Sequence, residues 1–208
     1  MSTTVIIPSH RINRRGLSQN REMHPAPRIV AVTVSVRPAC PDDVPALADL
    51  AARTFPLACP PGLAAAAIDA FVAENLCEAA FAEYLRTPGH TVLVGLDKDG
   101  EVRAYALLVD GTGMDPECAS VLTGLSTVGV SKFYVDPALH GLGVAGVLLD
   151  AAVATARQAG ASSLWLATNV DNARARAFYV RNGFAERGTR VFTVGGTENN
   201  DVVLEKPL

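Results

Sequence analysis

Residues 140–149 read HGLGVAGVLL, and this glycine-rich stretch decides between two folds. Gly141, Gly143 and Gly146 have the spacing G-x-G-x-x-G, which is typical of a loop that holds a dinucleotide at the start of a helix. Backbone N–H groups at a helix start lack intrahelical partners, and the helix dipole is positive there, so such a loop suits a phosphate. The flanking sequence has to identify the ligand.

The sequence around the loop does not fit a dinucleotide-binding fold. That fold needs the glycines directly after a strand, an acidic residue about 20 positions further on, and more alternating strands and helices. Here residues 136–140 separate the preceding strand from Gly141, and the next strand ends in Ala167, Thr168 and Asn169 with no acid. A nicotinamide-dependent oxidoreductase is therefore kept only as an alternative.

The pattern of apolar residues and turn signals predicts the elements on both sides of the loop. Upstream we expect a strand over residues 30–36, a helix capped by Asp42 or Asp43 and running to about Arg53, one or two helices over 63–85, a hairpin over 91–109, an irregular segment over 111–126 with a short helical turn, and a strand over 128–135. Downstream we expect a helix from the loop to about 158, a strand over 163–167, a helix over 171–181 and a hairpin over 184–205.

This order of elements predicts the fold class. It indicates an α/β (α+β) protein with a mixed, mostly antiparallel sheet of six to seven strands, flanked by helices, with one right-handed β-α-β crossover around the glycine loop. A chain of 208 residues suits one domain with its own core. No window approaches the roughly 18 consecutive apolar residues of a membrane span, so we expect no membrane partner.

Charge and cysteine content narrow the class further. Residues 1–30 contain five arginines and the single acid Glu22, so they read as a disordered basic extension, with a transit peptide or an over-long reading frame starting at Met23 as alternatives. The rest of the chain is acidic, which argues against a nucleic-acid partner. The cysteines show no zinc or disulfide spacing, which favours free, mostly buried thiols and a cytoplasmic location. They are Cys40, Cys59, Cys77 and Cys118.

The loop also fits a second pattern when it is counted from His140, with Gly143 three positions later and Ala145 two after that. At this point the sequence resembles the GNAT superfamily of acetyl-CoA-dependent N-acyltransferases, whose signature is Gln or Arg, two residues, Gly, one residue, then Gly or Ala. The preceding FYVDP and the following GVLLDAAV look like the same block. His140 departs from the signature, since the family usually has Arg or Gln there.

Two further stretches carry the same resemblance. Residues 172–184 read NARARAFYVRNGF and are similar to the later helix of the family, while VRPACPDDVPALADLA, residues 36–51, looks like its first strand and helix. The resemblance covers about residues 34–208. It implies a GNAT-like N-acetyltransferase domain over that range, with acetyl-CoA as cosubstrate and no metal.

The resemblance also implies the cofactor site. The backbone of Phe133, Tyr134 and Val135 would pair with the pantetheine arm of coenzyme A, Asn172 would hydrogen-bond that arm, and Phe178 would border it. The pyrophosphate would lie on the loop, formed by His140, Gly141, Leu142, Gly143, Val144, Ala145 and Gly146. The nucleotide phosphates could be reached by Arg174, Arg176 and Arg181.

Several of these residues have a structural alternative. Asn172 can act as a helix cap, and His140 can be a solvated loop residue. If His140 does contact the pyrophosphate, affinity should fall as its ring loses a proton above about pH 6.5. Tyr179 matches the tyrosine that in many family members protonates the leaving thiolate, and its alternative is a core aromatic beside Phe178.

Acyl transfer to an amine requires a neutral amine and a stabilised leaving thiolate. The resemblance implies a general base near the central strands, yet SKFYV, residues 131–135, contains no acid. Tyr134, Glu101, His90 and Asp136 through water stay open as candidates, as does catalysis without a dedicated base.

We therefore expect an N-acetyltransferase that moves an acetyl group from acetyl-CoA directly to a primary amine of a small molecule or a protein, with Tyr179 as general acid. The alternative from another class is a coenzyme-A-binding sensor or regulatory module without turnover. A homodimer formed through the closing hairpin is expected by analogy with the family alone.

Overall fold

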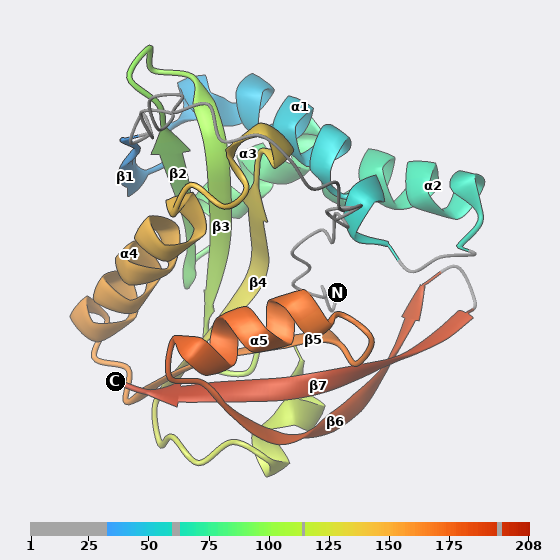
Figure 1. The fold of residues 1–208 in the computed structure, drawn as a ribbon, viewed down its shortest axis with the longest axis vertical. Coiled ribbons are helices and arrows are strands. Elements are labelled where there is room, and N and C mark those ends of the chain that lie inside the picture. Colours follow the sequence, from blue (N-terminus) through green and yellow to red (C-terminus); the bar gives the residue numbers. More distant parts are fainter. Residues whose placement is uncertain (1–32, 60–62, 114, 195–196) are drawn as a thin grey trace, which may run out of the picture.

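The computed structural model describes residues 33–59, 63–113, 115–194 and 197–208, so the basic extension predicted for residues 1–30 lies outside the described part. Its seven strands form one sheet in the order β1-β2-β3-β4-β5-β7-β6 (Figure 1). The strands are β1 (Ser35–Pro38), β2 (His90–Leu96), β3 (Val102–Asp110), β4 (Thr127–Val135), β5 (Ser163–Asn169), β6 (Ala185–Val194) and β7 (Thr197–Pro207). The mixed, mostly antiparallel sheet confirms the predicted fold class, and the parallel pair is β4 with β5.

Helices connect these strands where the sequence predicted them. They are α1 (Val44–Thr54), α2 (Ala65–Asn75), α3 (Glu78–Arg86), α4 (Val144–Gln158) and α5 (Ala173–Arg181), with short 3-10 turns at Pro41–Asp43, Pro56–Ala58, Pro116–Ser120 and Pro137–Leu139. The helical stretch over residues 63–85 is divided after Asn75, as its apolar spacing indicated. Within the described residues no helix is long and apolar enough to cross a membrane.

One prediction near the start of the described chain needs correction. The first strand is Ser35–Pro38, shorter and later than the stretch 30–36, of which residues 30–32 lie outside the described part. The alternation of β-branched residues does not show which of them find a partner, and the ladder with β2 begins at Ser35. The next helix agrees with the prediction, since Asp43 is its N-cap and Val44 its first residue, while the Asp43 carboxylate accepts the backbone N–H of Cys40 at 2.7 Å.

The cysteines are free, as predicted, but they are not mostly buried. Cys118 is buried, Cys59 and Cys77 are half-buried, and Cys40 is exposed.

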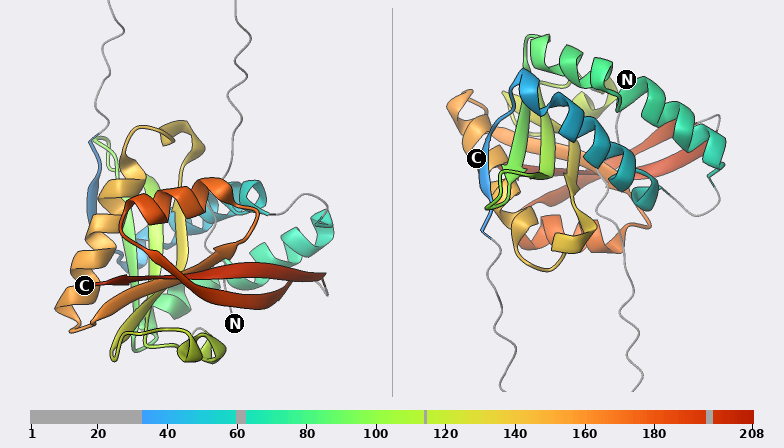
Figure 2. Two further views of the ribbon diagram at one scale, coloured as in Figure 1. Left: turned by 60° about the horizontal axis from the view of Figure 1, so that its bottom comes forward. Right: turned by 90° about the horizontal axis from the view of Figure 1, so that it is seen from above.

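The sheet separates two hydrophobic layers (Figure 2). On one face α4 and α5 pack through Leu148, Leu149 and Tyr179 against Phe133 and neighbouring strand residues. On the other face α1 and α3 pack through residues such as Leu50 and Phe81. Burial of these side chains supplies the main favourable term of folding.

Strands β4 and β5 separate after a short ladder. Their pairing covers only Thr127 with Ser163, Val128 with Leu164 and Gly129 with Trp165, whereas β5 continues along β7 as far as Asn169. In Figure 1, β5 and β7 run across the direction of β4. The remainder of β4 therefore has one edge that no strand of the described chain covers, which leaves its backbone groups open to a ligand.

Candidate functional site: a glycine cradle beside the open edge of β4

A pocket of about 210 Å³ opens where β4, the glycine loop, α4 and α5 meet. Most of its lining comes from the predicted loop and strand end, and two arginines of α5 complete it. The lining residues are Phe133, Val135, Leu139, His140, Gly141, Gly143, Val144, Ala145, Gly146, Arg174, Phe178 and Arg181. The structure thus brings together eleven of the residues named for the site from the sequence, and they come from β4, the glycine loop, α4 and α5.

The loop is shaped as an anion cradle at the N-terminus of α4. Gly141 and Gly143 have φ values of 83° and 86°, in the left-handed region that favours glycine. Gly143 is the N-cap of α4, and a Cβ on either glycine would meet nothing within 4 Å. Gly146 N–H already donates to the carbonyl oxygen of Gly143 at 2.9 Å, so the N–H groups of Val144 and Ala145 are the ones in the first turn with which a phosphate could bond.

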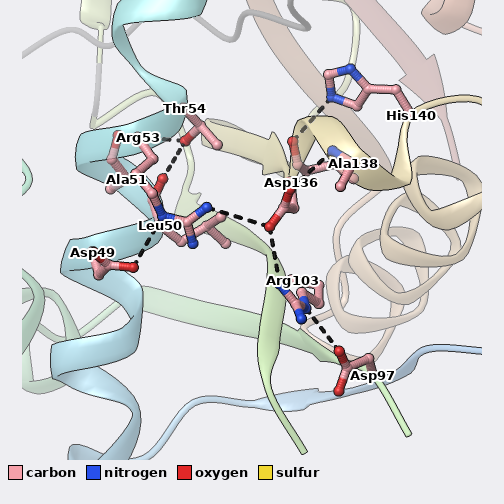
Figure 3. A network of polar contacts seen from close by, with 11 residues as sticks. Asp49, Leu50, Ala51, Arg53, Thr54, Asp97, Arg103, Asp136, Ala138 and His140 are labelled. Atoms are coloured by element: carbon pink, nitrogen blue, oxygen red, sulfur yellow. Dashed lines mark hydrogen bonds and ion pairs between the residues drawn. The ribbon is translucent and has the colours of Figure 1, made fainter. Parts of the chain in front are cut away.

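His140 is tied to the strand that precedes the loop. Its Nε2 donates to the carbonyl oxygen of Val135 at 3.1 Å, and its ring lines the pocket. Figure 3 shows the ring turned back toward the end of β4. This bond fixes the entry of the loop, a role that a freely solvated residue would not have.

The arginines of α5 divide into two groups. Arg174 and Arg181 line the pocket, whereas Arg176 is held by Glu186 at 2.8 Å and by the carbonyl oxygen of Val170 at 2.9 Å. Of the three predicted phosphate contacts, Arg176 is thus directed elsewhere. Asn172 also has a local task, since its Oδ1 accepts the N–H of Ala175 at 3.0 Å and caps α5.

Three other predicted residues lie outside the pocket lining. Leu142 is exposed at the loop tip, with a relative accessibility of 41%. The ring of Tyr134 belongs to the opposite hydrophobic layer, so its contribution on the pocket side is limited to its backbone. Tyr179 lies beneath the pocket, fully buried among Phe133, Phe178 and Phe184 at ring distances of 5.1 to 6.1 Å.

The phenol of Tyr179 lies in the core without a hydrogen bond among the described residues. Its ring is a core aromatic, but its Oη has no hydrogen-bond partner among the described residues. Burial, and then the neighbouring Tyr134, raises the pKa of Tyr179 above its ordinary range, so the phenol keeps its proton near neutral pH. A buried hydroxyl without a partner is uncommon in native structures and suggests a missing contact.

Asp136 sits at the centre of an ion-pair network at the end of β4 (Figure 3). Its carboxylate accepts from Arg53 at 3.4 Å, Arg103 at 3.3 Å and the N–H of Ala138 at 3.0 Å, and Arg103 also contacts Asp97 at 2.8 Å. Burial opposes the ionised form, but these bonds prevail and lower the pKa of Asp136. The network joins α1 and β3 to the strand end from which the loop departs.

The residues predicted as possible general bases are poorly positioned or have pKa values that do not suit the role. Glu101 is exposed beside the β2–β3 turn, and Asp136 is engaged by the two arginines described above. Burial raises the pKa of Tyr134, so its phenolate is scarce near neutral pH. His90 is half-buried on β2, and burial and Lys132 lower its pKa.

Lys132 was not selected from the sequence. Its side chain is on the same side of β4 as Tyr134, is 2% exposed, and places Nζ 4.7 Å from the ring centroid of Tyr84 on α3. Burial lowers the pKa of Lys132 to about 7. The available signal was a lysine in the middle of the strand VGVSKFYV, where a fully covered strand is usually apolar.

Known proteins that this chain resembles belong to one family. The model of the family described as "Acetyltransferase (GNAT) family" matches residues 46–184. An uncharacterised N-acetyltransferase of Mycobacterium tuberculosis (strain ATCC 25618 / H37Rv) is 42% identical over 166 residues, which cover 80% of this chain and 98% of the relative.

Solved structures show the same fold at low identity. PaiA N-acetyltransferase from Thermoplasma acidophilum, in complex with coenzyme A, matches with a TM-score of 0.67 and 16% identity over 85% of this chain and 99% of that one. The ribosomal-protein-S18-alanine N-acetyltransferase from Escherichia coli matches with a TM-score of 0.60 and 18% identity over 84% and 94%. By its family match, its relatives and its fold, the chain belongs to the acetyltransferase (GNAT) family and is an acyltransferase.

Proposed function

We propose that the protein transfers an acetyl group from acetyl-CoA to a primary amine, of a small molecule or of a protein, by direct attack of the amine on the thioester. The observation that supports this proposal most directly is that the open edge of β4 ends at the glycine cradle. The described residues fit coenzyme A, because the cradle offers unpaired N–H groups to a pyrophosphate, and Arg174 and Arg181 add positive charge beside it. A solved structure of the same fold is described as a coenzyme A complex, which supports this ligand.

The cofactor arm would run from the cradle along β4. Phe133 and Val135 line the pocket, and the backbone of residues 133–135 lies beyond the short ladder with β5. The arm can complete the hydrogen bonds of that edge as an additional strand would. This places the thioester beside the central strand, with a backbone N–H there available to polarise its carbonyl.

Tyr179 would protonate the departing sulfur of coenzyme A. Its Oη is buried beneath the pocket without a partner among the described residues, and its pKa is raised, so the phenol is protonated and can donate. Tyr179→Phe should lower kcat by about 100-fold, a typical size for a lost general acid, while the Kd for acetyl-CoA stays within twofold. Because the hydroxyl makes no internal bond, Tm should be unchanged, and a full rate in this variant contradicts the assigned role.

The binding test is calorimetric titration with coenzyme A, acetyl-CoA and NADH in parallel. Gly143→Glu should abolish coenzyme A binding by placing a carboxylate in the cradle. Gly100→Glu is the matched control, because Gly100 has a φ of 82° and equally open surroundings in a distant turn. Binding of NADH alone overturns the proposal, and tight acetyl-CoA binding without CoA release to any amine indicates a sensor instead.

A further inference from the structure

The far side of β4, opposite the cofactor pocket, contains several buried polar side chains. The pocket for the cofactor opens on the side of α4 and α5. A thioester held at the β4 edge is then covered by its own cofactor on that side, so an amine has to approach from the layer of α1 and α3. Lys132 and Tyr134 belong to that layer.

Buried polar atoms without partners mark this layer as a place where a ligand is missing. Tyr105 on β3 and Tyr134 on β4 are paired across the sheet, their rings stack at 5.3 Å, and they are at most 1% exposed. Neither Oη has a hydrogen-bond partner among the described residues, and the same holds for Nδ1 of His90. Native interiors satisfy nearly all such groups, so two adjacent buried phenols point to a polar group that arrives from outside.

Lys132 occupies the same cluster. Its Nζ lies 4.7 Å from the ring centroid of Tyr84, and burial of the ammonium group makes the charged form costly. The titratable groups of this layer are Tyr84 of α3, on which Glu74 and Cys77 act, His90 of β2, on which Lys132 and Asp110 act, and the paired Tyr105 and Tyr134. Asp110 is exposed at the strand end.

We propose that this layer holds the acceptor amine, with the hydroxyls of Tyr105 and Tyr134 as its hydrogen-bond partners and Nζ of Lys132 as the acceptor of the proton that the incoming ammonium loses. The inference rests on the proposed acetyl transfer and supplies the base that the sequence did not reveal. Burial lowers the pKa of Lys132 to about 7, so a large share of Nζ is uncharged at pH 7 to 8.

The proton balance of the step is complete. The ammonium gives one proton to neutral Lys132, and the freed lone pair attacks the carbonyl carbon. The C–N bond forms and the C–S bond breaks, and the sulfur takes the proton of Tyr179. The amide nitrogen keeps one of its three protons. One goes to Lys132 and then to solvent, and the other replaces the proton that Tyr179 gave up.

The test compares the wild type with Lys132→Met, which removes the amine and keeps the length of the side chain. Release of the coenzyme A thiol from acetyl-CoA is measured between pH 6 and 10 with glycinamide, 2-phenylethylamine, spermidine and water as acceptors. The matched control is Lys98→Met, since Lys98 is an exposed lysine in the β2–β3 turn. Acetyl-CoA affinity and Tm are measured for every variant.

Lys132→Met should lower kcat by about 100-fold near pH 7, with acetyl-CoA affinity within twofold of the wild type. The deficit should shrink at high pH, where the acceptor amine is already neutral. Tm should be unchanged or higher, because a buried ionisable group is replaced by an apolar one of similar size. A merely structural lysine would not produce this pH-dependent deficit.

A second variant tests the hydroxyl pair. Tyr105→Phe combined with Tyr134→Phe should raise the KM of the amine by about tenfold, the effect expected for a lost hydrogen bond to a charged group. A wild-type rate in Lys132→Met across the whole pH range overturns the inference. If the wild type binds acetyl-CoA yet releases thiol to neither amine nor water, the proposed transfer itself fails, and this outcome is visible without any variant.

Discussion

Two buried ionisable side chains, Lys132 on β4 and Glu205 on β7, have opposite surroundings. Lys132 is 2% exposed and Glu205 is 0% exposed. Burial lowers the pKa of Lys132 to about 7, and burial also opposes the charge on Glu205. Even so, hydrogen bonds from Thr123, Gly124 and Ser163 lower the pKa of Glu205 to about 2. Burial alone does not set the charge of a side chain, because the donors and acceptors around it decide.

This difference distinguishes Glu205, which holds parts of the fold together, from Lys132, which lies in the proposed acceptor layer. Glu205 accepts bonds from Thr123, Gly124, Ser163 and Arg187 at 2.7 to 3.1 Å, so it fixes the segment after the 3-10 turn Pro116–Ser120 to β5 and β6. In the layer that contains Lys132, by contrast, the hydroxyls of Tyr105 and Tyr134 have no hydrogen-bond partner among the described residues. A satisfied buried network holds a fold together, whereas an incomplete one is ready for a ligand.

The largest expected effect on stability is at Glu205, whose hydrogen bonds are complete. Glu205→Ala leaves the Arg187 charge and several buried donors without an acceptor, so the free energy of unfolding should fall by about 3 to 5 kcal/mol. Urea denaturation followed by circular dichroism measures it. An equal loss in Lys132→Met would erase the contrast between the two regions.

The acid dependence of stability sharpens the same contrast. The pKa of Glu205 in the folded state, about 2, is below its ordinary value of 4.5, so its contribution to stability is fully present above pH 4.5 and is lost as the pH falls toward 2. The stability difference between wild type and Glu205→Gln should therefore shrink over that window. Urea titrations at pH 2.5, 3.5, 4.5 and 6 measure it, and a constant difference would contradict the assignment.

Removal of single hydroxyls gives a smaller and more selective test. Ser163→Ala deletes a bond of 2.8 Å to Glu205 and should cost about 1 to 3 kcal/mol, since it leaves a buried carboxylate oxygen short of a donor. Tyr134→Phe deletes a hydroxyl without a described partner and should change the stability by less than about 0.5 kcal/mol. Similar losses in both variants would show that the Tyr134 hydroxyl is already satisfied.

A small effect is also expected at the half-exposed pair between Arg53 and Asp136. The Arg53 side chain is 49% exposed, so solvent screens the contact, and Arg53→Ala should cost no more than about 1 kcal/mol. The acetyl-CoA Kd should rise severalfold at most, because Arg103 still holds Asp136 at the start of the loop. Thermal unfolding and calorimetry check both values, and a loss the size of the Glu205 effect would reverse the ranking.

Local patterns in the sequence predicted much of the site. The glycine positions of the loop, the cap at Asn172 and the boundary near Asn75 follow from interactions within a few residues, and the structure has all three. The sheet class followed from the order of elements. These features depend on backbone conformation and on neighbours close in the chain, which sequence patterns report directly.

The remaining features depend on residues distant in the sequence. The burial of Lys132 arises from Tyr84 on α3 and from strands on both sides, and the capture of Asp136 by Arg53 joins α1 to the end of β4. Arg176 likewise reaches Glu186 only because β6 brings Glu186 close to α5. No periodicity in one segment reveals such partners, so the base candidates chosen by residue type were incomplete.

The sheet order also has a consequence for biosynthesis. From β1 to β4 the order in the sheet follows the order in the chain, although α1 to α3 are made between β1 and β2. By contrast, β5 pairs with β7, and the ladder that β6 forms among the described residues is with β7. On the ribosome the first half-sheet can therefore assemble early, while the second has to wait for β7 to emerge. Until then β5 and β6 present uncovered edges, the state in which aggregation competes with folding. The gap between β4 and β5 thus joins an early-folding half of the molecule to a late-folding one.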